Sequence, residues 1–133
     1  MARYLAAYLA VALAMAMLDM IWLRTTAKFV YEPAIGELLG KRTNIAAAIL
    51  FYVLYVLGIM VFAVGPALRG GDGLAALVAG AAFGFFAYVT YDLSNMATLK
   101  VWPARLAAID IAWGSFLTAI AASAGYAAGW FVA

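Results

Sequence analysis

Four long apolar stretches constrain this chain more than any other feature of its sequence. A helix needs about 20 mostly apolar residues to cross the hydrocarbon core of a bilayer. Only helices and closed barrels satisfy their backbone polar groups in lipid, and these stretches lack the alternation that barrel strands show. The sequence therefore predicts an all-α fold, an integral membrane four-helix transmembrane bundle. We expect a single transmembrane domain over 1–133, with spans at about 4–23, 45–64, 74–93 and 106–131.

The composition indicates lipid as the solvent and excludes several kinds of site. Hydrophobic residues make up 70% of the 133 residues and charged residues 11%, whereas a soluble domain is about half apolar and about a quarter charged. Cysteine and histidine are both absent, which excludes disulfides, thiol catalysis and the commonest metal and haem ligands. We therefore expect no metal site and no cofactor and name no catalytic residue. The sequence has no basic stripe of the kind that would indicate nucleic acid as a partner.

Lysine and arginine are distributed unequally between the two ends of the predicted bundle. Four spans place both termini and the 65–73 turn on one side, which carries Arg3 and Arg69. The loops 24–44 and 94–105 on the other side hold the remaining basic residues, which are Arg24, Lys28, Lys41, Arg42, Lys100 and Arg105. The positive-inside rule favours those loops in the cytoplasm and both termini in the periplasm or outside the cell.

The 24–44 loop is amphiphilic. Its apolar side chains fit one face of a short helix lying in the membrane interface, formed by Phe29, Tyr31, Ile35, Leu38 and Leu39. An ordinary amphiphilic connector is the alternative, and the sequence does not decide between the two.

Three of the six acidic residues lie inside predicted spans. Asp19 is near the end of the first span, Asp92 near the end of the third and Asp110 near the start of the fourth. Because the first and third spans run in the same direction and the fourth runs back, the three carboxyl groups reach one face of the bundle. Asn44 and Asn95 arrive at the same face. Acidic residues within a membrane are by default a functional-site hypothesis, so we expect a polar pocket there.

Helical spacing places two of these aspartates on faces of small residues. Asp92 shares a face of the third span with Gly80, Gly84, Tyr88 and Asn95. Asp110 shares a face of the fourth span with Gly114, Thr118, Ala121, Gly125 and Gly129. Glycines four residues apart are typical of helices that pack closely in membranes. We therefore predict that the five glycines mediate helix packing and that both carboxyl groups face the interior.

Aromatic residues recur around the acids in repeated patterns. Asp-x-x-Trp occurs at 19–22 and 110–113, and Tyr-x-x-Tyr at 52–55 and 88–91. Trp22 and Trp102 are at positions typical of the interfacial aromatic belt, whereas the deeper Trp113 and tyrosines need partners for their polar tips. The predicted pocket therefore comprises Asp19, Trp22, Asn44, Tyr55, Tyr88, Tyr91, Asp92, Asn95, Asp110 and Trp113.

Motifs spread over nearly the whole chain point to one family. They are Leu-Asp-Met-Ile-Trp-Leu at 18–23, Asn44, Phe-Tyr-Val-Leu-Tyr at 51–55, Gly84, Tyr88, Tyr-Asp-Leu-Ser-Asn at 91–95, Ala-Thr-Leu at 97–99, Trp102, and Asp-Ile-Ala-Trp-Gly at 110–114. With these residues the chain resembles a bacterial family of small membrane proteins catalogued as domain of unknown function 2177. The resemblance implies four spans and the bacterial inner membrane, and it supplies no catalytic role.

Three classes of function remain open from the sequence. Binding or transport of a cation, a proton or a small polar molecule ranks first, and four spans are few for a transporter, so small-residue faces would join copies into a homo-oligomer. A structural or accessory subunit of a membrane complex ranks second. In that role the acids lock the helices by bonding Arg24, Lys100, Arg105, Asn44 or tyrosine hydroxyls. A membrane enzyme acting on a lipid-soluble substrate ranks last, because no histidine, thiol or serine elbow is available.

Overall fold

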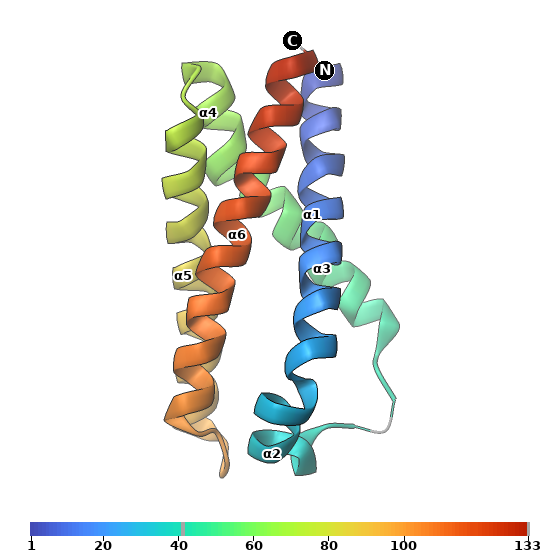
Figure 1. Ribbon diagram of the computed structural model, residues 1–133, viewed down its shortest axis with the longest axis vertical. Helices are drawn as coiled ribbons and strands as arrows, with labels where there is room; N and C mark the ends of the chain where they lie inside the picture. Colours follow the sequence, from blue (N-terminus) through green and yellow to red (C-terminus); the bar gives the residue numbers. More distant parts are fainter. Residues whose placement is uncertain (41, 133) are drawn as a thin grey trace.

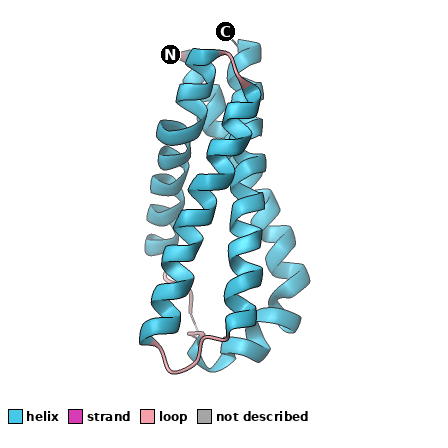
Figure 2. Cartoon of the chain, turned by 90° about the vertical axis from the view of Figure 1, so that its left-hand side faces the viewer, coloured by secondary structure: helices cyan, strands magenta, loops and turns pink. Residues whose placement is uncertain are grey.

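The computed structural model of the protein describes residues 1–40 and 42–132, and the elements within them are all helical (Figures 1 and 2). The first helical segment comprises α1 (Ala2–Thr26), a π turn η1 (Ala27–Tyr31), α2 (Glu32–Ile35) and a 3-10 turn η2 (Gly36–Leu38). The second comprises α3 (Ile45–Ile59), a π turn η3 (Met60–Val64) and α4 (Gly65–Gly70). The last two segments are the long helices α5 (Gly73–Thr98) and α6 (Ala104–Val132).

Four of these segments are long and apolar enough to cross a membrane, namely Ala2–Leu38, Ile45–Gly70, Gly73–Thr98 and Ala104–Val132. Many large apolar side chains point outward, and those on α1 recur every fourth residue at Leu5, Leu9 and Leu13. An apolar outer surface of this kind suits lipid and not water. The predicted all-α fold with four membrane-spanning helices is confirmed.

Helix α6 packs along α1 on one side and along α5 on the other, and both chain termini lie at the same end of the bundle (Figure 1). Helix α3 is arranged differently. Its first half leans away from the other helices (Figure 1), and residues 49–51 are exposed. The segment joins the core from Tyr55 onward, through Val56, Ile59 and the π turn η3. The bundle is therefore close-packed near the termini and more open at the opposite end.

Small residues let α6 approach its neighbours closely. A Cβ atom added to Gly84 of α5 would lie 2.4 Å from the carbonyl oxygen of Gly114, and one added to Gly80 would lie 2.6 Å from Cβ of Ala122. On α6, added Cβ atoms at Gly125 and Gly129 would meet side chains of α1 and α4 at 2.4 and 2.7 Å. The glycine faces that we expected to join copies of the chain are thus occupied within one chain.

The observed helices extend beyond the predicted spans. Helix α1 continues past Leu23 because the hydroxyls of Thr25 and Thr26 donate to the carbonyls one turn earlier, so polar residues are accommodated within the helix. The second segment continues through Pro66, where the sequence indicated a turn. The π turn η3 ends immediately before Gly65, and Pro66 then occupies the first turn of α4, where a missing N–H is tolerated.

The 27–38 part of the 24–44 loop is helical, comprising η1, α2 and η2, whereas the apolar face expected to lie in the membrane interface stays a prediction. Of the five side chains expected on that face, Ile35 is buried, whereas Phe29, Leu38 and Leu39 are exposed. The hydroxyl of Tyr31 is directed toward α6, where it bonds to an aspartate. The π turn η1 contains Tyr31 and sets this direction.

Replacing Gly84 by leucine tests the close approach of α5 and α6. The added side chain must displace the backbone of α6 at Gly114, and overpacking of this kind costs about 1–3 kcal/mol. We expect a lower thermal midpoint of unfolding in detergent. The control is Gly70→Ala, whose Cβ meets no atom within 4 Å. Equal midpoints for the two variants would contradict the close helix contact.

Candidate functional site: a cluster of intramembrane carboxyl groups

Asp19 lies at the contact between α1, α3 and α6. Its Oδ1 accepts a hydrogen bond from Nε1 of Trp113 on α6 at 3.2 Å, and its Oδ2 accepts one from the hydroxyl of Tyr52 on α3. Asp19, in contrast to Asp92 and Asp110, shares no face of small residues that would predict an inward orientation. In the structure both of its oxygens face donors from other helices, so the side chain is directed into the bundle.

Asp110 is bonded through a relay that starts on α1. Nε1 of Trp22 donates to the Tyr31 hydroxyl at 2.9 Å, and that hydroxyl donates to Oδ1 of Asp110 at 2.8 Å. The Trp22 and Trp113 rings stack at a centroid distance of 4.4 Å and an interplanar angle of 5°. The two Asp-x-x-Trp sequences therefore meet in space, and each aspartate receives a hydrogen bond from the tryptophan of the other, directly or through Tyr31.

Asp92 is the most buried of the three acids, with 0% of its surface exposed. Its Oδ1 accepts a hydrogen bond at 3.1 Å from Nε1 of Trp102, which precedes α6. Its Oδ2 is buried, and no donor among the described residues reaches it. The carboxyl group within hydrogen-bonding reach of Asp92 is that of Asp110, which is 7% exposed. Two nearly buried acids thus face each other where α5 and α6 meet.

The tyrosines of α3 and α5 form an aromatic wall beside this pair. The Tyr55 hydroxyl lies 2.8 Å from Oγ1 of Thr118, and Thr118 donates its own hydrogen to the carbonyl of Gly114, so Tyr55 is the donor between them. The Tyr55 ring meets that of Tyr88 edge to face at 6.5 Å. Tyr91, which is more exposed, packs edge to face on Trp102 at 5.6 Å.

A cavity of about 420 Å³ lies against this wall. Phe51 and Tyr55 of α3 line one side, Ala87, Tyr88 and Tyr91 of α5 line the other, and Asp110 of α6 contributes the carboxyl group. The divergence of α3 from the bundle leaves room for it. Aromatic surfaces with one convergent charged or polar group are typical of small-molecule sites, and the volume is within their usual range.

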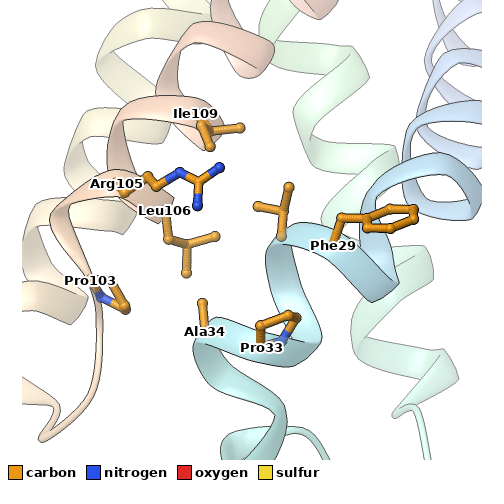
Figure 3. A pocket seen from close by; sticks show the side chains of 8 residues that line it. Phe29, Pro33, Ala34, Pro103, Arg105, Leu106 and Ile109 are labelled. Atoms are coloured by element: carbon orange, nitrogen blue, oxygen red, sulfur yellow. The ribbon is translucent and has the colours of Figure 1, made fainter.

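A smaller hollow of about 220 Å³ lies between the 29–34 turn and the start of α6 (Figure 3). Among the described residues that line it, Arg105 alone is charged, and Figure 3 shows the guanidinium directed into the space beside Leu106 and Ile109. The other lining side chains, among them Phe29 and Pro33, are apolar. This hollow contains none of the clustered acids and is distinct from the aromatic cavity.

Two predicted pocket residues are placed differently from the rest. Asn44 is exposed at the start of α3, where its side chain accepts from the backbone N–H of Ala47 at 3.1 Å. Because α3 leans outward there, Asn44 is an N-cap and not a member of the carboxyl cluster. Asn95 is half-buried one turn beyond Tyr91 and lies within hydrogen-bonding reach of its hydroxyl.

Four residues of this region were not among the predicted pocket residues: Tyr31, Tyr52, Trp102 and Thr118. Tyr52 belongs to a Tyr-x-x-Tyr pattern that the sequence displayed, so a signal for it existed. Trp102 matched the interfacial belt, yet its indole N–H is directed inward to Asp92. Tyr31 carried no signal, because its direction depends on the π turn η1.

A bundle-locking role suggested cations, Asn44 or tyrosine hydroxyls as partners of the three acids, and the observed donors include two tyrosine hydroxyls. Within the described residues, every donor to Asp19, Asp92 and Asp110 is an indole N–H or a phenol O–H, and none is Arg24, Lys100 or Arg105. Likewise, no group of three or more acidic, histidine or cysteine side chains in the described part of the chain is arranged to hold a metal ion.

Replacing Tyr31 by phenylalanine tests the relay to Asp110. The change leaves the Trp22 indole and one Asp110 oxygen without their partner, at a cost of about 1–3 kcal/mol. We expect amide hydrogen exchange over 27–38 to become about tenfold faster or more, because this turn is held to α6 by that hydroxyl. Tyr126→Phe at the other end is the control. Unchanged exchange in Tyr31→Phe would show that the relay does not hold the turn.

Comparison with known proteins places the chain in a family. A search among curated proteins and a search among solved structures found no match. A family described as "Predicted membrane protein (DUF2177)" matches residues 4–127, which include all three clustered acids and their hydrogen-bond donors. The resemblance seen in the sequence motifs is thereby confirmed. The chain is a member of this DUF2177 family of membrane proteins.

Proposed function

We propose that the protein binds a small organic cation in the aromatic cavity beside Asp110 and serves in its transport. One observation carries this proposal. The cavity combines four aromatic side chains with a carboxyl group, and none of the described residues that line it is basic. Aromatic ring faces attract cations within about 6 Å of the ring centroid, and an acid adds a counter-charge. Phe51, Tyr55, Tyr88 and Tyr91 would surround the apolar part of such a ligand, and Asp110 would pair with its charge.

The chemistry of the donors around Asp110 supports this assignment. Tyr31 bonds one of its oxygens, but a phenol leaves the negative charge uncompensated. A carboxylate in an apolar environment without a cation is costly to bury. A bound ammonium group would supply the missing charge. This gives the site a physical reason to prefer a cation over a neutral or anionic ligand of similar size.

Asp110→Asn tests the proposal, because asparagine keeps the shape of the side chain and removes the carboxylate that lines the cavity. The probe is tetramethylammonium, and its binding to the purified protein in lipid nanodiscs is measured by calorimetry. We expect wild type to bind and the variant to bind at least about tenfold more weakly, since loss of one partner of a desolvated charge pair costs more than about 1.4 kcal/mol.

The matched control is Asp72→Asn, because Asp72 caps α5 and asparagine caps helices equally well. This variant should bind like wild type. Wild type that fails to bind tetramethylammonium, or Asp110→Asn that binds as tightly as wild type, would refute cation binding at this cavity.

A structural role is the second candidate, and the hydrogen bonds themselves favour it. Asp19 accepts donors from α3 and α6, and Asp110 accepts one from η1, so the acids tie four segments together. As an accessory subunit, the protein would need these bonds for folding and for contact with a membrane partner. A protein that binds no cation but is destabilised by Asp19→Asn and co-purifies with one stable partner would favour this role.

We also propose that the carboxyl cluster faces the cytoplasm of a bacterial cell, across its inner membrane. The cluster end carries Arg24, Lys28, Arg42, Lys100 and Arg105, whereas the end with both termini carries Arg3 and Arg69. Lys41, which the sequence also assigns to the cluster end, lies outside the described residues. Basic loops remain preferentially in the cytoplasm.

A C-terminal fusion to alkaline phosphatase tests this orientation, because that enzyme is active only after export. We expect high phosphatase activity for the C-terminal fusion and low activity for a fusion inserted at residue 100. The reverse pattern would place the cluster at the outer face of the membrane.

A further inference from the structure

Oδ2 of Asp92 is the polar atom that the cation-binding proposal leaves unexplained. It is buried in a side chain with no exposed surface, and no donor among the described residues reaches it. A buried oxygen without a partner costs about 1–3 kcal/mol, and more when it carries charge. Native structures rarely leave such a cost uncompensated. Oδ2 of Asp92 therefore requires a hydrogen. An ionised Asp92 carboxylate has none of its own, so a proton must lie at this oxygen.

Asp110 is the group in place to share that hydrogen. Its carboxyl group lies within hydrogen-bonding reach of Asp92. The outer oxygens of the two acids are already occupied, since Oδ1 of Asp110 accepts from Tyr31 and Oδ1 of Asp92 accepts from Trp102. Two ionised carboxylates at this separation repel each other strongly, and sharing one proton removes the repulsion. A proton shared with Asp110 gives Oδ2 of Asp92 the hydrogen that it otherwise lacks.

We propose that Asp92 and Asp110 share one proton, so that the pair presents a single negative charge to the aromatic cavity and selects a monovalent organic cation. Asp110 lines the cavity and contacts the ligand, whereas Asp92 does not line it and acts as a positioning residue. This inference rests on the proposed cation site and specifies its ligand class. The single negative charge of the pair would neutralise only one of the two positive charges of a divalent cation.

The groups that face the pair allow this charge to change with pH. They are Tyr31 from η1 and Tyr88 and Tyr91 from α5, together with the indole of Trp102, which does not titrate. Each of these is neutral, so the shared proton is the titrating element. Raising the pH removes this proton and gives the pair two negative charges. Lowering the pH adds a second proton and removes the charge that holds the cation.

Infrared spectroscopy of the protein in nanodiscs detects the shared proton without any ligand. We expect a carbonyl band of a protonated carboxyl group in wild type and in Asp19→Asn, and loss of that band in both Asp92→Asn and Asp110→Asn. Each variant removes one of the two carboxyl groups that share the proton. Either variant is therefore sufficient if the other fails to fold. A wild-type spectrum without the band, or a band that persists in both variants, would overturn the shared proton.

Charge selectivity tests the ligand class. We expect wild type at neutral pH to bind tetramethylammonium at least about tenfold more tightly than ethylene-bis(trimethylammonium), a dication whose two charges do not change with pH. Raising the pH should strengthen dication binding to wild type but not to Asp92→Asn, whose amide holds the charge at one. Equal preference for both probes, or the same pH rise in Asp92→Asn, would contradict the inference. If neither probe binds, the proposed cation site is wrong. The infrared band still tests whether the two carboxyl groups share a proton, because that measurement uses no ligand.

Discussion

The placement of three carboxyl groups among apolar helices, two of them buried and that of Asp19 half-buried, is the constraint on which this structure depends. Lipid supplies no hydrogen bonds, so each oxygen atom must find a donor within the protein. Four of the six oxygen atoms accept from aromatic donors, namely the indoles of Trp102 and Trp113 and the hydroxyls of Tyr31 and Tyr52, whereas Oδ2 of Asp92 is buried without a donor among the described residues. Aromatic donors bring large apolar rings with them and add no positive charge. The cluster thus remains compatible with the membrane while keeping its negative charge available.

The position of α6 makes this arrangement possible. Small residues along α6 and α5 bring the two backbones close together, and Gly114 leaves space for the Tyr88 ring, which a Cβ atom there would meet at 2.2 Å. Where the glycines end, larger polar and aromatic groups fill the interface between the helices. Helix α3 diverges at the same level, which opens the aromatic cavity beside Asp110. Packing at one end of the bundle therefore shapes the site at the other.

Much of this could be predicted from local sequence. Apolar run length indicated the four helices, and the directions of the helices predicted that the three aspartates meet at one end. Asn44 was misplaced because the lean of α3 is set by contacts between helices and has no signature in the sequence of the helix. Tyr31 was missed because a single added residue in a π turn changes the direction of the side chains that follow. Trp102 was assigned to the interfacial belt from its depth along the chain, whereas its indole N–H is directed inward by the hydrogen bond to Asp92.

On the proposed function, Asp110 provides the charge for a cation held among aromatic rings. Solid-state NMR offers the most direct measurement, through magnetisation transfer between ¹⁵N-labelled tetramethylammonium and aspartate side-chain carbons of the protein in lipid. We expect transfer to a carboxyl carbon that disappears in Asp110→Asn, together with transfer to tyrosine ring carbons within about 6 Å of the nitrogen. Transfer that persists unchanged in Asp110→Asn, or no transfer in wild type, would contradict the proposed function.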